Sequence, residues 1–483
     1  MHSASERPAS RGPGHLAWIV AALCALGIWL LLRDSGPCDD EYIVWRYARN
    51  QLGTGGLSFS PYGEEVEGFT CPLWLVLCAL ALKLSIAPLA LVAFTGLAST
   101  LGSAWIALAA RGRARAESDF WCALSIALCV ALGYHAAQGL GTALAAALVA
   151  GWYVLLARER RNLAGLVLGA ATLLRPELLV LLLFHALGAR RVLATLVALA
   201  LPLCWFWIRH ETFGEWLPNT YYVKQLPLGA ELSFGFAYLG RATLDCGIGA
   251  LLLLLLVVRP QARVARTALA GALAVTAGVV WVGGDYMFLA RFLVPILPLV
   301  LMLCADALAR FEAGARRRVR LLWIAILLLQ LWPIARLGEL RDSQRFYEQR
   351  WIAIGRALAE HAPRGWKLAT SPIGAIGWYS KLEMVDMLGL TNRALRDVPP
   401  DLSIELKGHQ RHDAHWVLGE RPDGIILGNG ISPRGEKSLD VNAWEKELYL
   451  DPRFQSDYEP RLLPIPGQLS LLYFQLRSGQ PLH

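Results

Sequence analysis

Apolar runs with arginine clusters between them constrain the fold of this chain more than any other feature. A helix needs about 17–25 apolar residues to cross the hydrocarbon layer of a membrane. Hydrophobic residues make up 55% of the 483 residues and charged residues only 17%, which is unusual for a soluble protein. We therefore predict an α-helical polytopic membrane protein. Its crossings, about eleven by this measure, fall near 16–32, 88–110, 119–134, 142–157, 163–174, 177–188, 192–208, 233–258, 267–283, 292–309 and 320–337.

The arginines indicate how the chain is oriented. A net charge of +8 could suggest nucleic-acid binding, but clusters between apolar runs are typical of membrane topology signals. If the N-terminus is cytoplasmic and the stretch 72–87 does not cross, all the clusters face the cytoplasm. We therefore interpret 72–87 as re-entrant or interfacial, and we expect an extracytoplasmic C-terminus. The clusters are Arg111/Arg113/Arg115, Arg158/Arg160/Arg161, Arg190/Arg191, Arg259/Arg263/Arg266 and Arg310 with Arg316/Arg317/Arg318/Arg320.

Two short segments leave alternatives. The run 16–32 follows basic residues as a signal peptide would, but it has no clear cleavage site, so we predict an uncleaved anchor. Cys38 and Cys71 share one external loop and are either a disulfide pair or two thiols.

The chain changes character after Arg336. Residues 1–337 form the predicted transmembrane domain, with a first external loop over 34–72. Residues 338–483 contain half of the acidic groups and no run long enough to span. Their β-like and helix-like runs predict an extracytoplasmic α/β domain. These runs are Glu348–Ala359, Lys367–Thr370, Met384–Leu388, Gly424–Leu427 and Leu471–Leu476.

With this topology the polar motifs all lie on the outer face. Asp39 and Asp40 directly follow the first apolar run, and carboxylates beside hydrocarbon usually have a function. One of them can act as a base while the other raises its pKa or shares a divalent cation, Mg or Mn. Alternatively, Asp39 only caps a helix that starts near Tyr42.

Cationic groups on the same face suit a phosphate. The candidates are Arg175, Lys224 and Arg291, because a guanidinium matches phosphate oxygens and lysine acts as a point charge. Arg175 could instead pair with Glu177, and Arg291 with Asp285. Amide, hydroxyl and aromatic groups that suit sugars lie at Asn219, Tyr221 and Tyr222, although interfacial tyrosines are also common membrane anchors. Glu65 and Glu67 either assist Asp39 and Asp40 or are solvated.

These motifs resemble GT-C glycosyltransferases that use polyprenyl-phosphate sugars, in particular the terminal arabinofuranosyltransferases of the bacterial cell wall. That family reads approximately Asp-Asp-Ala-Tyr-Ile, Phe-Arg-Tyr-Ala and Val-Glu-Gly-Tyr-Thr-Asn-Pro-Leu-Trp in its first loop. The counterparts here are Asp39 to Ile43, Trp45 to Ala48 and Val66 to Trp74, followed by Leu173 to Glu177, Leu217 to Lys224, Gly283 to Tyr286 with Arg291 to Pro295, and Asp386 to Thr391.

The resemblance implies a GT-C fold in the bacterial inner membrane and an inverting transfer from a polyprenyl-phosphate sugar to a glycan, lipid or protein. It implies Asp39 and Asp40 as the catalytic pair and as the ligands of any metal. The implied substrate-binding residues are Arg46, Glu67, Arg175, Glu177, Asn219, Tyr221, Tyr222, Lys224, Asp285, Tyr286 and Arg291.

The sequence departs from the family at three positions. Gly141 replaces a glutamate, Cys71 an asparagine and Asn392 an aspartate. The missing carboxylate at Gly141 leaves open an inactive relative that acts as a scaffold for envelope assembly. A transporter or lipid-handling protein is a further alternative, although transporters commonly show repeats and charges at mid-membrane.

Overall fold

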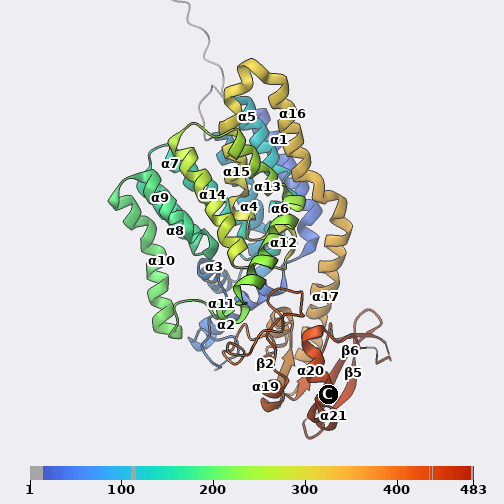
Figure 1. Ribbon diagram of the computed structural model, residues 1–483. Coiled ribbons are helices and arrows are strands. Elements are labelled where there is room, and N and C mark those ends of the chain that lie inside the picture. The colour runs from blue at the N-terminus through green and yellow to red at the C-terminus, as the bar shows by residue number, and fades with distance from the viewer. Residues whose placement is uncertain are drawn as a thin grey trace, which may run out of the picture.

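The computed structural model describes residues 15–61, 63–109, 116–434, 436–437, 439–479 and 482. A helical part made by the first two thirds of the chain stands on a smaller part that contains a β-sheet (Figure 1). The helical run that holds α16 and α17 descends along one side and joins the two (Figure 1).

Among the described residues, six helical segments are long and apolar enough to cross a membrane, or eight if each of two bent pairs counts as one span. The protein is thus a multi-pass membrane protein, but the predicted number of eleven crossings is not confirmed. The six segments are His15–Ser35 with α1 (His15–Leu32), α4 (Pro88–Ala109), α10 (Val192–Phe213), α14 (Arg263–Trp281), Val294–Phe311 with α15 (Leu297–Leu308), and Gly314–Asp342 with most of α16 (Glu312–Leu331).

Two predicted crossings are bent pairs of helices. Over 233–258, α12 (Leu228–Cys246) and α13 (Ile248–Val257) meet at an angle of 88°, so this stretch is not one straight helix. Gly247 lies between them with a φ of +70°, a left-handed conformation that ends one helix and starts the next. Over 119–134, α5 (Ala116–Ala127) and α6 (Val130–Gln138) are bent by 44°.

Several apolar runs form helices too short to span alone. At a rise of about 1.5 Å per residue, the 16 residues of α7 (Thr142–Ala157) extend about 24 Å, less than a hydrocarbon core of about 30 Å. The helices α8 (Arg161–Thr172) and α9 (Leu181–Ala189) are shorter still. The 12-residue α3 (Pro72–Lys83) agrees with our interpretation that 72–87 does not cross.

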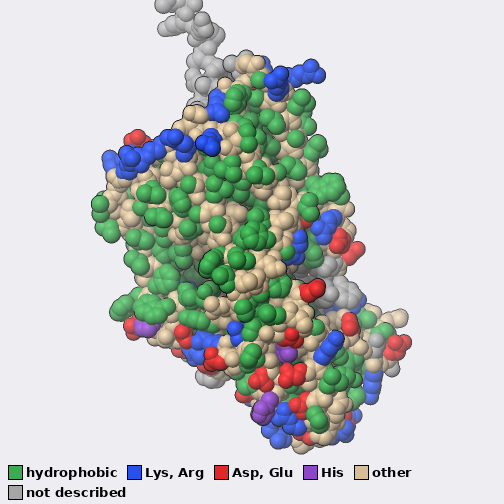
Figure 2. All heavy atoms as spheres, in the orientation of Figure 1, with side chains coloured by type: hydrophobic (Ala, Val, Ile, Leu, Met, Phe, Trp, Pro, Cys, Tyr) green, Lys and Arg blue, Asp and Glu red, His purple; other side chains and the backbone are tan. Residues whose placement is uncertain are grey.

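The two ends of the molecule differ in charge. Lys and Arg gather at the end of the helical part far from the sheet, whereas near and on the sheet part Asp, Glu and His lie together with further Lys and Arg (Figure 2). The Arg158–Arg161, Arg190 and Arg316–Arg318 clusters are exposed or partly exposed. The predicted cluster at 111–115 lies outside the described residues. Side chains between the two ends include large exposed hydrophobic residues, such as Phe94 and Val192, as expected for surfaces that face lipid.

Residues after Arg336 form one mixed sheet with helices on both faces. The predicted strands are confirmed with shifted ends, and β4 and β5 are added. The order is β2-β1-β3-β6-β4, with β5 on the other edge of β6, and β1 is parallel to β2 and β3. The elements are α17 (Leu337–His361), β1 (Lys367–Thr370), α18 (Gly374–Ser380), β2 (Glu383–Asp386), α19 (Ala414–Gly419), β3 (Gly424–Ile425), β4 (Ile431–Pro433), α20 (Lys446–Leu450), α21 (Pro452–Asp457), β5 (Tyr458–Ile465) and β6 (Leu469–Leu476).

The sheet has two buried faces because side chains alternate along each strand. Leu368 belongs to the large core that continues into the membrane helices. Its neighbour Ala369 belongs to a second core that includes Phe454 of α21. The sheet part is therefore packed directly onto the helical part.

Candidate active site

A cavity of about 630 Å³ lies between the sheet part and the ends of the membrane helices that are nearest to it. Two short helices bound it: α2 (Asp39–Thr54) and α11 (Asn219–Lys224). The wall is completed by the 3₁₀ turn Pro176–Val180, the start of α12, the last part of α14, and Leu390 and Lys407 of the sheet part. Much of the wall is apolar and includes Val44, Val180, Leu217, Leu226, Leu228, Ala274, Trp281 and Val282.

Four cations and four acids interrupt this apolar wall. The cations are Arg175, Lys224, Arg291 and Lys407, and the acids are Asp40, Glu177, Glu231 and Asp285. Their formal charges cancel, so what matters is how they pair.

Arg291 holds two acids. Its Nε lies 2.5 Å from Asp285 Oδ2 and its Nη1 lies 3.4 Å from Asp40 Oδ2. Burial opposes ionisation of Asp285, but Arg291 and more distant cations outweigh it, so the pKa of Asp285 is lowered. Asp285 and Arg291 thus form the pair that was the alternative to phosphate binding by Arg291, and Asp40 joins them.

Arg175 is paired on one side only. Its Nε lies 2.8 Å from Glu177 Oε1, and the guanidinium lies over the ring of Phe292. Its Nη2 is buried and has no hydrogen-bond partner among the described residues. An unpaired buried donor is costly, so this atom is available to an anion in the cavity.

Lys224 is in the last turn of α11, at the cavity wall. Within the described part of the chain, its ammonium group has no salt bridge or hydrogen bond. Tyr221 of the same helix also lines the cavity, and its ring is partly exposed.

Asp39 faces away from the cavity. Its carboxylate accepts hydrogen bonds from the backbone N–H groups of Gly374, at 2.9 Å, and Ala375, at 2.7 Å, which begin α18. It does not cap its own helix, because the N-cap of α2 is Cys38 and no side chain caps it. Burial raises the pKa of Asp39 to about 7, although the two N–H groups oppose this shift. Of the aspartate pair, only Asp40 lines the cavity.

Five other predicted residues lie outside the cavity wall, namely Arg46, Glu67, Asn219, Tyr222 and Tyr286. Arg46 is fully buried and donates to the carbonyl groups of Phe59, Gly377 and Leu382, so it ties α2 to the sheet part. Burial lowers the pKa of Arg46 to about 9. Glu67 is buried in a salt bridge with Arg209.

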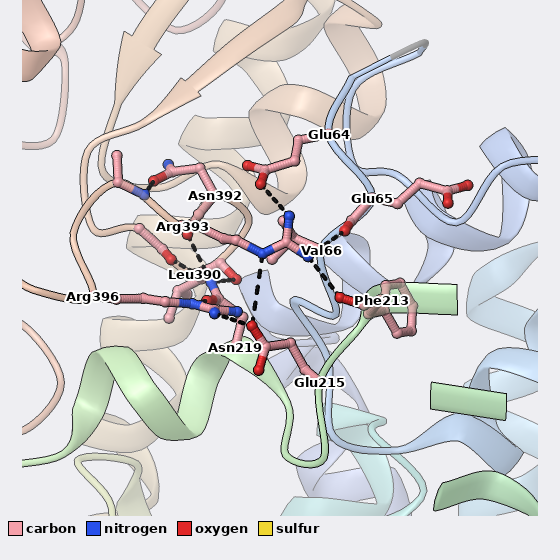
Figure 3. Close-up of polar contacts among 12 residues, drawn as sticks. Glu64, Glu65, Val66, Phe213, Glu215, Asn219, Leu390, Asn392, Arg393 and Arg396 are labelled. Atoms are coloured by element: carbon pink, nitrogen blue, oxygen red, sulfur yellow. Dashed lines mark hydrogen bonds and ion pairs between the residues drawn. The ribbon is translucent and has the colours of Figure 1, made fainter. Parts of the chain in front are cut away.

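The third residue, Asn219, joins the two parts of the protein. Its amide donates to the carbonyl groups of Gly389, Leu390 and Asn392. Figure 3 shows these contacts beside Arg393 and Arg396, which reach acidic and carbonyl groups of the helical part. Arg396 also lies over the ring of Tyr222, another predicted residue outside the cavity wall.

Tyr286 is close to the site but does not line the cavity. Its ring packs edge-on against His409, with centroids 5.5 Å apart, and His409 lies 4.4 Å from the ring of Trp444. Asp40 and burial raise the pKa of Tyr286 well above its usual value. Burial and Lys224 lower the pKa of His409 to about 4, so both rings are neutral at pH 7.

Three residues in and beside the site were not predicted: Glu41, Glu231 and Lys407. Glu41 is fully buried and accepts hydrogen bonds from Trp45 Nε1 at 2.7 Å, Trp74 Nε1 at 2.8 Å and Leu140 N at 2.6 Å. Burial raises its pKa to about 7. Its position within the Asp39-Asp40-Glu41 acidic run was the available signal.

The residues around Asp40 do not fit a divalent cation. Such an ion needs several oxygen ligands, but Asp40 is paired with Arg291 and the carboxylate of Asp39 is bonded to α18. Across the described ranges, no group of three His, Cys, Asp or Glu residues could hold a metal. Cys38 and Cys71 are both buried thiols rather than a disulfide.

Solved structures similar to this chain point to one fold. The crystal structure of ArnT from Cupriavidus metallidurans bound to undecaprenyl phosphate matches with a TM-score of 0.55 at 14% identity, over 77% of this chain and 86% of that one. The apo structure of the same protein matches with a TM-score of 0.54 at 15% identity and the same coverage. At this identity the similarity shows the fold alone.

The sequence comparisons add less. A family profile described as "Domain of unknown function (DUF8728)" matches residues 338–465. No curated protein matches the sequence. The resemblance to the arabinofuranosyltransferases therefore stays a prediction.

Proposed function

We propose that this protein is an inverting membrane glycosyltransferase. It moves a pentofuranose or hexose from a polyprenyl monophosphate to a glycan, lipid or protein outside the cytoplasm. Its place is the inner membrane of a bacterium, with the sheet part, residues 338–483, on the extracytoplasmic side.

The observation that carries this proposal is the composition of the cavity wall. An isoprenoid chain needs an apolar surface, and a phosphate needs desolvated cations beside it. The cavity offers both, with an apolar wall from α14 and α12 next to Arg175, Lys224 and Arg291. Trp281 and Leu228 of that wall are more than half exposed, at 60% and 51%, which suits entry of a lipid from the side.

Each charged residue then has a role in the transfer. Asp40 accepts the proton of the acceptor hydroxyl, whose oxygen forms a bond to the anomeric carbon of the sugar. The bond between that carbon and the phosphate oxygen breaks, and polyprenyl phosphate leaves with the electron pair. Arg175 and Lys224 stabilise the charge that develops on the phosphate, and Arg291 orients Asp40. Asp39 positions α2 through its contact with α18.

An assay with defined donors tests the proposal. Membranes containing the protein are incubated with a panel of radiolabelled polyprenyl-phosphate sugars and with envelope acceptors, beside membranes that contain the Asp40→Asn variant. Transfer of one sugar by the unchanged protein, lost in the variant, is expected. If no polyprenyl-phosphate sugar binds or reacts, the proposal is wrong.

A further inference from the structure

Lys407 carries a charge from the sheet part into the cavity. It lies in the connection between β2 and α19, yet its side chain is only 8% exposed and lines the cavity. Its Nζ forms a salt bridge with Glu231 at the start of α12 and donates to the backbone carbonyl of Lys224 at 3.0 Å. One cation of the cavity thus comes from outside the membrane helices.

The turn that presents Lys407 is held in place. Gln410 accepts a hydrogen bond from Gly408 N at 2.8 Å, and its amide donates to Ile404 O at 3.0 Å. The backbone of Gln410 also accepts from Asp401 N at 2.7 Å. Lys407 is therefore fixed by its own segment as well as by Glu231.

Two glycines make room for this contact. A Cβ at Gly283 would lie 2.2 Å from Glu231 Oε2 and 3.0 Å from Lys407 Nζ. A Cβ at Gly408 would lie 3.2 Å from Lys224 Cε. Both glycines have positive φ values, so side chains are disfavoured there on two grounds. The Gly283-Gly284-Asp285-Tyr286 motif thus admits the charged pair to the cavity.

The charges at this end of the cavity are not balanced pair by pair. Lys407 has Glu231, but Lys224 beside it has no salt bridge with any described residue. Burial and Lys224 both lower the pKa of Lys407, while Glu231 raises it. Lys407 is buried and Lys224 is half-buried, so two neighbouring ammonium groups with one carboxylate leave a place for a further anion.

We propose that Lys407 is a phosphate-binding residue, so that the sheet part completes the binding site for the lipid phosphate. This inference rests on the proposed function. In this inference, Lys407 binds the phosphate group of the polyprenyl carrier together with Lys224 and Arg175. The site is then complete only while the sheet part is docked on the helical part.

The alternative is that Lys407 and Glu231 form a structural ion pair only. Single variants separate the two cases, because the two cases predict different effects of Glu231→Gln on phosphate binding. If Lys407 binds phosphate, Lys407→Met weakens binding, whereas Glu231→Gln removes a competing anion and preserves or tightens binding. A structural pair would instead weaken binding in both variants, since each leaves one buried charge without its partner.

The experiment measures binding of undecaprenyl phosphate, without a sugar, to the full chain in detergent. The variants are Lys407→Met, Lys407→Arg, Glu231→Gln and the double variant Lys407→Met/Glu231→Gln. Arg393→Met is the matched control, because Arg393 also links the sheet part to the helical part but lies outside the cavity wall (Figure 3). Size-exclusion profiles and unfolding midpoints identify any variant that fails to fold.

We expect Lys407→Met to weaken binding about tenfold, the scale of one charge-assisted hydrogen bond, and Lys407→Arg to retain it. The double variant stays weak, because removing Glu231 relieves an unpaired acid but restores no cation. Normal binding by the double variant, or weakening in both single variants, overturns the inference. Absence of binding by the unchanged protein overturns the proposed function and this inference together.

Discussion

Asp39 and Asp40 are adjacent in the sequence, but their carboxylates meet different parts of the molecule. Asp40 lines the cavity and pairs with Arg291, whereas Asp39 bonds to the first N–H groups of α18. Consecutive residues on a helix point about 100° apart. The sequence identified the pair, but it could not say which member faces the cavity, because the contact on α18 lies more than 330 positions away.

The first prediction concerns the base. We expect Asp40→Asn to insert and accumulate normally but to lose transfer by about 100-fold or more, since a positioned base contributes on that scale. Asp39→Asn should lose much less, because the amide oxygen still accepts a hydrogen bond from α18. Initial transfer rates in membranes that contain equal amounts of protein provide the measurement. Near-normal transfer by Asp40→Asn would exclude this mechanism.

The second prediction concerns the phosphate. We expect Arg175→Ala and Lys224→Ala each to raise the KM for the polyprenyl-phosphate donor about tenfold or more, because each removes a charged partner from a desolvated site. Arg209→Ala is the control. Arg209 is buried with Glu67, outside the cavity wall, so its loss should reduce stability rather than donor affinity. An unchanged KM in both cavity variants would identify Arg175 and Lys224 as structural.

The structure explains why residue 141 is a glycine here, where the arabinofuranosyltransferase-like motif has a glutamate. A Cβ there would lie 2.9 Å from Leu174 Cδ2 and 3.3 Å from Trp74 Cε3, and the φ of Gly141 is +65°. A glutamate would be strained in this conformation and would crowd Leu174. The Glu41 carboxylate bonds to the backbone of Leu140 instead. The acid beside the turn at Leu140 is therefore Glu41 of α2, whereas residue 141 itself supplies none.

At the scale of the elements, the positions of the helices were easier to predict from the sequence than the bends between them. The apolar runs coincide with helices because burial or lipid exposure requires apolar side chains along the whole run. The bend at Gly247 was missed because the runs on both sides of it are equally apolar and only the φ of one glycine separates them. β5 was missed because its burial does not alternate and it contains Pro460 and Pro464, as an edge strand can.

The contact between α2 and α18 leads to a prediction about pH. The pKa of Asp39 is 3.8 in its reference state and about 7 in the fold. Between these values the folded protein binds the proton and the unfolded chain does not. Stability linked to Asp39 is therefore highest below about pH 4 and decreases as the pH rises to about 7. Glu41, with a folded pKa also near 7, acts in the same direction.

We expect the thermal unfolding midpoint of the full chain in detergent to decrease as the pH is raised from 5 to 8. Asp39→Asn should reduce this slope, and the part due to Glu41 should remain. Over this pH range, the unchanged protein should lose on the order of 1 kcal/mol more unfolding free energy than the variant. One pKa unit corresponds to about 1.4 kcal/mol, and the effect is reduced because Asp39 is only partly buried. The result is contradicted if the slopes of the variant and the unchanged protein coincide.

At the scale of the whole molecule, the site depends on distant segments that fold together. Asp40 comes from the start of α2, Arg291 from the loop after α14, and Lys407 from the sheet part. The sequence marked Asp40 and Arg291, because charges stand out next to apolar runs. It did not mark Lys407, since a lysine in a polar region carries no signal until the fold buries it.

The last prediction concerns topology, which determines the side of the membrane on which this site opens. The cavity lies at the end of the helices next to the sheet part, and the clusters Arg158–Arg161, Arg190–Arg191 and Arg316–Arg318 lie at surface positions (Figures 1 and 2). Because cytoplasmic loops carry the excess of Lys and Arg, we expect a reporter inserted near Arg316 to be cytoplasmic. Reporters near Gly63 and after His483 should both be extracytoplasmic, since the first external loop and the sheet part border the same cavity.

Paired reporters that are active on opposite sides of the membrane, such as alkaline phosphatase and green fluorescent protein, give this measurement. A cytoplasmic signal from the C-terminal fusion would contradict the arrangement and would place the cavity on the cytoplasmic side.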